Sequence, residues 1–193
     1  MTDTGPGVWS GWRSKEIRIT GAGERKPVPL EIRGGFTSTF LVQPVRSGTE
    51  GRDTGLFILT TSGGGPHRVV LPPQFDSLLI SRQRVGSEGA SGFHRWKVRV
   101  VSGAALPTLS SETVEGQRTE SFTYSPPTGR TGPALLHYEF QGRGEIIYCP
   151  GTGEPPKTVR TSTYEERAGT LPLPHQGYVT VLTSEKWKVS ITP

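Results

Sequence analysis

Alternation of apolar and polar residues is the main structural signal in this sequence. In the stretch FHRWKVRVV, Trp96, Val98 and Val100 alternate with basic residues, and EKWKVSI repeats the pattern with Trp187 and Val189. A period of two residues is typical of a half-buried β-strand, whose successive side chains point to opposite faces. Both stretches are therefore predicted to be antiparallel strands that close a small domain, with the tryptophan supplying a large buried area.

Further strands follow from the same pattern, and no convincing amphipathic helix accompanies them. The chain has 193 residues with 26 glycines and 17 prolines, a composition suited to short strands joined by tight turns. The sequence therefore predicts an all-β fold. The predicted strands are 28–33, 36–43, 56–61, 67–71, 77–82, 121–125, 134–140, 144–149, 158–164 and 177–182.

The two tryptophan strands belong to a longer internal repetition. Three further pairs of blocks occur in the same order in both halves: KEIRIT (15–20) with ESFTYS (120–125), 29–42 with 136–149, and 68–80 with 168–181. In the last two pairs Gly34 is aligned with Gly142, and Leu71 with Leu171. Four matches in order favour a duplicated unit of about 90 residues, the size of a small β-sandwich.

We accordingly predict two tandem antiparallel β-sandwich modules, of jelly-roll or immunoglobulin-like type, that arose by internal duplication. The expected boundaries are an N-terminal arm at 1–12, copy 1 at 13–102, a polar linker at 103–117 and copy 2 at 118–193. The main length difference is an insertion at 82–95 in copy 1. The alternative is one continuous sandwich whose strands look alike because all strands alternate.

Composition excludes several classes of protein. No run of apolar residues is long enough for a transmembrane helix, and residues 1–16 lack the pattern of a secretory signal. The single cysteine, Cys149, excludes an internal disulfide and suits a reducing compartment. We therefore expect a cytoplasmic protein, or part of a particle that assembles inside the cell. The net charge of +5 is uneven, because residues 1–103 hold 14 Lys and Arg against 8 Asp and Glu.

The second half resembles a known repeat family. The stretch ALLHYEFQGRGEIIYC…GTLPLPHQGYVTVLTSEKWKVSI is similar to small all-β repeats of actinobacterial proteins, which sometimes accompany tellurium-resistance or stress-response domains. The resemblance covers 134–192 and, more faintly, 29–101. It implies a β-sandwich and a cytoplasmic setting, and it assigns no chemistry. Where some members have Asn-Phe after the first turn, this chain has Glu145 and Ile146.

No motif names a reaction. The histidines His67, His94, His137 and His175 are scattered without the close pair that a zinc site usually has, so no metal is expected. A nucleophile elbow is absent, and Cys149 in a predicted strand is interpreted as a small buried residue. The glycine-rich stretch 60–68 lacks the Lys-Ser/Thr ending of a phosphate loop. We predict neither enzymatic activity nor a cofactor.

A basic strip at the insertion is the strongest candidate for binding. It consists of Arg82, Arg84, Arg95, Lys97 and Arg99, of which the last three project from one strand face at intervals of roughly 7 Å. Such a row could contact an acidic protein surface or phosphates. The ordinary alternative is an outward strand face that charge keeps soluble and protects from edge pairing. Nucleic acid is disfavoured because the aromatic residues fall mostly on the opposite, core-facing side.

Two tryptophans near the N-terminus form a second candidate. Trp9 and Trp12 could be exposed anchors for a sugar or a protein, or an arm folded over a core edge. The leading hypothesis is a non-catalytic structural or interaction protein whose partner is another protein. The alternatives are a module that binds carbohydrate or another small ligand, and a structural component of a virion or contractile injection apparatus. The sequence does not predict an oligomeric state.

Overall fold

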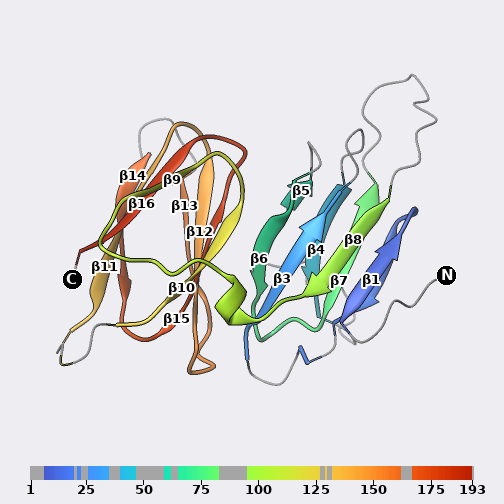
Figure 1. Ribbon diagram of the computed structural model, residues 1–193, viewed down its shortest axis with the longest axis horizontal. Coiled ribbons are helices and arrows are strands. Elements are labelled where there is room, and N and C mark those ends of the chain that lie inside the picture. Colours follow the sequence, from blue (N-terminus) through green and yellow to red (C-terminus); the bar gives the residue numbers. More distant parts are fainter. Residues whose placement is uncertain are drawn as a thin grey trace. The chain divides into compact units, whose positions relative to one another are not determined.

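The computed structural model describes residues 7–19, 21–22, 26–34, 40–46, 59–61, 65–82, 95–126, 129, 132–161 and 167–192. The chain divides into two compact units, Met1–Val101 and Ser102–Pro193, and both are built from strands (Figure 1). In the described part of the chain the only helical element is a single 3-10 turn, η1 (Gly103–Ala105). The all-β prediction is confirmed.

The first unit contributes eight strands to the described residues. They are β1 (Val8–Gly11), β2 (Lys15–Arg18), β3 (Val28–Arg33), β4 (Phe40–Val45), β5 (Leu59–Thr61), β6 (His67–Leu71), β7 (Ser77–Arg82) and β8 (Trp96–Val100). Two four-stranded sheets result, with the orders β1-β8-β3-β6 and β2-β7-β4-β5, and every pairing is antiparallel.

The second unit repeats this order. Its strands are β9 (Val114–Gly116), β10 (Glu120–Tyr124), β11 (Ala134–Phe140), β12 (Gly144–Pro150), β13 (Lys157–Thr161), β14 (Ala168–Leu173), β15 (Gly177–Leu182) and β16 (Trp187–Thr192). The sheets are β9-β16-β11-β14 and β10-β15-β12-β13. Strand for strand this is the order of the first unit. Eight strands in two such sheets form a jelly roll, so the strand order selects this type over the immunoglobulin-like one.

Each unit closes its interior around the predicted tryptophan. Trp96 is 1% exposed and Trp187 is 4% exposed. The indole N–H of Trp96 donates to the Arg13 carbonyl at 2.9 Å, and that of Trp187 donates to the Arg118 carbonyl at 2.8 Å. The two rings are therefore buried and hydrogen-bonded in the same way, as the repeated pattern predicts. A buried indole N–H normally finds such a partner.

The core of the second unit joins its two sheets. Phe122 on β10 meets Trp187 on β16 edge to face, with 5.8 Å between ring centroids. Cys149 is buried on β12, and burial raises the pKa of its thiol to about 12. It is thus a small core residue, as the sequence indicates, rather than a reactive thiolate.

The predicted arm and linker each contain a strand. Residues 8–11, within the expected arm at 1–12, form β1, which pairs with β8. Residues 114–116, within the expected linker at 103–117, form β9, which pairs with β16. Alternation could not predict them, because three or four residues ending in glycine are too short to show a period. Two more strands lie outside the predicted ranges, β2 and β14, although both fall inside the repeated blocks.

The ladders also correct the alignment of the repeats. Ile32 pairs with Val98, and Tyr138 pairs with Val189, so Ile32 corresponds to Tyr138. The alignment of Gly34 with Gly142 is therefore displaced by two residues. The connection from β3 to β4 and the connection from β11 to β12 differ in length, and the strand residues alone do not reveal where the extra residues lie. The shared strand order supports the duplication, which stays an inference.

Candidate functional site

The outer side of the sheet β1-β8-β3-β6 carries a concentration of positive charge. We call it the basic face and define it by Arg33, Arg68, Arg95, Lys97, Arg99 and the single carboxylate Glu31. The ladder places these residues side by side, because Arg99 pairs with Glu31, Glu31 pairs with Arg68, and Lys97 pairs with Arg33. Residues directly opposite each other on neighbouring strands project from the same face of the sheet.

Glu31 organises the centre of the basic face. One carboxylate oxygen accepts from Arg33 Nε and the other from Arg99 Nη2, both at 2.9 Å. The Glu31 side chain is only 5% exposed, whereas those of Arg33 and Arg99 are 51% and 46% exposed. Burial by itself would raise the pKa of Glu31, but the hydrogen bonds and charges of Arg99 and Arg33 outweigh it and lower that pKa. The carboxylate therefore stays ionised and holds both guanidinium groups in place.

Arg95 is held at the end of the same row. Its Nη2 donates to Ser10 Oγ at 3.0 Å, and its guanidinium carbon lies 5.8 Å from the centre of the Trp12 ring. Trp12 is 50% exposed, so half of this large apolar side chain is in contact with solvent. A cation over an indole face is a favourable arrangement, and Arg95 remains exposed.

The structure separates some of the predicted site residues. Arg95, Lys97 and Arg99 do lie on one face of β8 with Trp12 beside them. Trp9 instead pairs with the buried Val98 and so belongs to the core-facing side, which makes it half-buried and not an exposed anchor. Arg82 ends β7 in the other sheet, where its backbone N–H donates to Ser14 Oγ. Arg84 and the rest of the insertion up to His94 lie outside the described residues.

Sequence reasoning missed three members of the basic face: Glu31, Arg33 and Arg68. The alternation in VPLEIR does place Glu31 and Arg33 on the polar side of their strand. Which strand lies beside them is a long-range property, so the cluster became visible only through the ladder.

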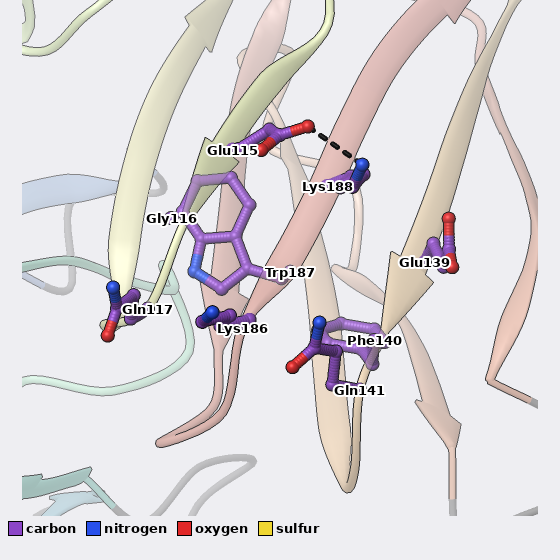
Figure 2. A pocket seen from close by; sticks show the side chains of 9 residues that line it. All are labelled: Glu115, Gly116, Gln117, Glu139, Phe140, Gln141, Lys186, Trp187 and Lys188. Atoms are coloured by element: carbon purple, nitrogen blue, oxygen red, sulfur yellow. Dashed lines mark ion pairs between the residues drawn. The ribbon is translucent and has the colours of Figure 1, made fainter.

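The equivalent sheet of the second unit presents a different surface. At the positions of Ser10, Lys97 and Arg33 it has Glu115, Lys188 and Glu139, which pair across β9, β16 and β11. The next row on the same face of this sheet consists of Gln117, Lys186 and Gln141. We call these six residues, which lie around Gly116, Phe140 and Trp187, the polar groove. Its cavity volume is about 360 Å³ (Figure 2).

Charges in the polar groove are balanced. Lys188 Nζ lies 2.8 Å from Glu115 Oε1, the ion pair drawn in Figure 2. The Glu115 hydrogen bond and charge raise the pKa of Lys188, and Glu139 adds a smaller effect in the same direction. A second hollow of about 730 Å³ adjoins the groove, shares Glu115, Glu139 and Lys188, and continues toward His137, Thr170 and Ser190.

Neither a metal-ligand cluster nor a membrane-spanning helix occurs among the described residues. Within these ranges no group of three or more His, Cys, Asp or Glu side chains is placed to hold a metal ion. Among the same residues, no helix is both long enough and apolar enough to cross a bilayer.

Comparisons with known proteins identify no family. No family model matches the sequence, and no curated protein matches it. Among solved structures, the CUB1-EGF-CUB2 domain of human MASP-1/3 is similar at 8% identity and a TM-score of 0.29, over 99% of this chain and 97% of that one. An oxalate decarboxylase is similar at 12% identity and a TM-score of 0.22, over 96% of this chain and 68% of that one. These scores are too low to support any argument about function.

Proposed function

We propose that the protein is a non-catalytic interaction module that binds an acidic protein surface through the basic face. The observation that carries this proposal is the set of five cations on one side of one sheet, against a single carboxylate that is already engaged. Charged side chains that are held in position before binding lose less conformational freedom when they bind. Ser10, Trp12 and Glu31 provide that restraint for Arg95, Arg33 and Arg99.

Glu31 also indicates what kind of ligand suits this face. Its carboxylate accepts one charge-assisted hydrogen bond from each of two guanidinium groups, so arginines of this face already bind a carboxylate. Lys97 on β8 and Arg95, which directly precedes β8, continue the row that begins at Arg99, and both are exposed. A row of carboxylates supplied by a partner would thus meet cations at intervals of roughly 7 Å along β8.

The test uses a synthetic peptide of alternating glutamate and serine, with binding measured by fluorescence anisotropy. In the double variant Arg95→Glu/Lys97→Glu we expect binding at least about tenfold weaker, because like charges then face each other. Arg99 is left unchanged, since a carboxylate there would lie against buried Glu31 and endanger the fold. The matched control is Arg118→Glu/Arg143→Glu, which alters the net charge equally at exposed positions of the second unit.

Two further measurements complete the test: the salt dependence of peptide binding and a comparison with duplex DNA. Binding should weaken as sodium chloride rises from 50 to 500 mM, because exposed charges are screened (the Debye length falls from about 10 Å at 0.1 M to about 3 Å at 1 M). If both double variants bind the peptide alike, the basic face is not the binding surface. If duplex DNA binds more tightly than the peptide and is lost in Arg95→Glu/Lys97→Glu, the face recognises nucleic acid and the proposal fails.

The remaining expectations stay predictions. The cytoplasmic setting, assembly into an intracellular particle and the link to the actinobacterial repeats have no support beyond the sequence. Affinity purification from the native host with mass spectrometry addresses all three, because it reports the natural partners directly.

A further inference from the structure

We propose that the polar groove of the second unit binds a stretch of neutral oligosaccharide. This site is independent of the basic face: it lies on the other unit, and it differs in both charge and chemistry. The groove was not predicted from the sequence, where a sugar site was considered at Trp9 and Trp12.

The hydrogen-bonding groups of the groove suit hydroxyl ligands. Gln117 and Gln141 are exposed and flank Lys186, which is exposed as well. No hydrogen bond joins the side chains of these three residues to another described residue. Each amide offers an acceptor and two donors close together, so one glutamine can bond to two adjacent hydroxyl groups. Figure 2 shows Gln117 and Gln141 on opposite sides of the pocket.

The charge balance argues for a neutral ligand. Two carboxylates, Glu115 and Glu139, accompany two ammonium groups, Lys186 and Lys188, and one pair of them is already joined at 2.8 Å. An anion would be repelled by the carboxylates and a cation by the ammonium groups. Sugar hydroxyls both donate and accept, so they can satisfy all four groups without adding charge.

The dimensions also fit a short carbohydrate. The two glutamines stand on β9 and β11, or next to their ends, with β16 between, so they are about 10 Å apart at the usual strand spacing. That distance corresponds to about two sugar rings. A volume of about 360 Å³ is within the range of small-ligand pockets, and the adjoining hollow of about 730 Å³ gives room for further sugar units.

Binding by such a groove should be weak. Trp187 is 4% exposed and Phe140 is 2% exposed, so neither ring offers a face on which a sugar could stack. Hydrogen bonds in contact with water each contribute little net binding free energy. We therefore expect a dissociation constant on the order of 1 mM.

The experiment is a titration of the full ¹⁵N-labelled chain, monitored by the backbone amide signals. The probes are maltohexaose, cellohexaose, xylohexaose and mannohexaose, with hexagalacturonic acid and chitosan hexamer as charged counterparts. We expect at least one neutral probe to shift the signals of Gln117, Gln141 and Lys186. The affinity should not change between 50 and 500 mM sodium chloride, since the ligand carries no charge.

A matched pair of variants tests whether the polar groove is the binding site. Gln117→Ala/Gln141→Ala should weaken binding at least about tenfold, which is the loss of about 1.4 kcal/mol. Gln176→Ala, which removes an exposed glutamine elsewhere in the same unit, should leave binding unchanged. The proposal is overturned if no neutral probe shifts the groove signals, if only a charged probe does, or if the two variants behave alike. None of these outcomes depends on whether the basic face binds acidic peptides.

Discussion

Trp96 and Trp187 each lie against a glycine of the neighbouring edge strand. Gly11 pairs with Trp96 and Gly116 pairs with Trp187. A Cβ atom at Gly11 would stand 2.5 Å from Cζ2 of the Trp96 ring. At Gly116 it would meet the same atom of Trp187 even more closely. Because these glycines have no side chain, the indole can cross the edge strand and reach the carbonyl of Arg13 or Arg118.

Replacing one of these glycines should destabilise its own unit. We expect Gly116→Ala to lower the free energy of unfolding by about 1–3 kcal/mol through overpacking. The cost should fall in a Trp187→Phe background, because phenylalanine lacks the ring atoms that the new Cβ would meet. Urea unfolding of the four proteins in this double-mutant cycle measures the coupling. Equal costs in both backgrounds would mean that the indole is not what requires glycine.

Glu31 should make the first unit sensitive to acid. Its pKa is lowered in the folded state, so its stabilising contribution is complete above the pKa of an unfolded glutamate, about 4.3. That contribution is lost as pH falls through the lower, folded-state pKa. Glu31→Gln should therefore cost about 1–3 kcal/mol at pH 7, and the difference from the unmodified protein should shrink below pH 4. Urea unfolding across this pH range measures it.

Glu16→Gln serves as the control for that titration. Glu16 is an exposed carboxylate on β2 of the same unit, so its replacement should change stability little at any pH. A cost of Glu31→Gln that is independent of pH would show that the carboxylate is held for its shape and not for its charge.

At the scale of the element, the short edge strands contribute more than their length suggests. β1 covers one side of β8, and β9 covers one side of β16. Each also carries the glycine that receives the indole. Without β1 the sheet would lose four residue pairings, and Trp96 would face solvent along one edge.

Removing β1 should accordingly destabilise the first unit. A chain that starts at Trp12 should unfold at lower urea, and its tryptophan fluorescence should shift to longer wavelength as Trp96 becomes hydrated. A chain that starts at Gly7 keeps β1 and should behave like the unmodified protein. If the chain starting at Trp12 unfolds at the same urea concentration as the control, the pairing of β1 with β8 does not stabilise the first unit.

At the scale of the whole molecule, the chain consists of two units with one strand order and two kinds of surface. The boundary lies between Val101 and Ser102. Each unit buries its own tryptophan, and the second unit has its own apolar core. The basic face and the polar groove lie on equivalent sheets, so the same scaffold presents two surfaces that differ in charge.

The second unit should fold when expressed alone. Residues 102–193 contain only one of the four tryptophans, Trp187, which serves as a built-in probe. We expect the isolated unit to show the short-wavelength emission of a buried indole and a single cooperative urea transition. Emission like that of free tryptophan in water would instead show that the second unit depends on the first.

The sequence by itself determined the all-β class, the repetition and the two closing tryptophans, because alternation and large apolar side chains are local properties that are visible along a single strand of sufficient length. Only the tertiary structure decided the jelly-roll order, the place of Glu31 between Arg33 and Arg99, and the polar groove. These depend on which strands lie side by side. Glu31 and Arg99 are 68 positions apart, and Trp96 and Arg13 are 83 positions apart. No local pattern records such a pairing.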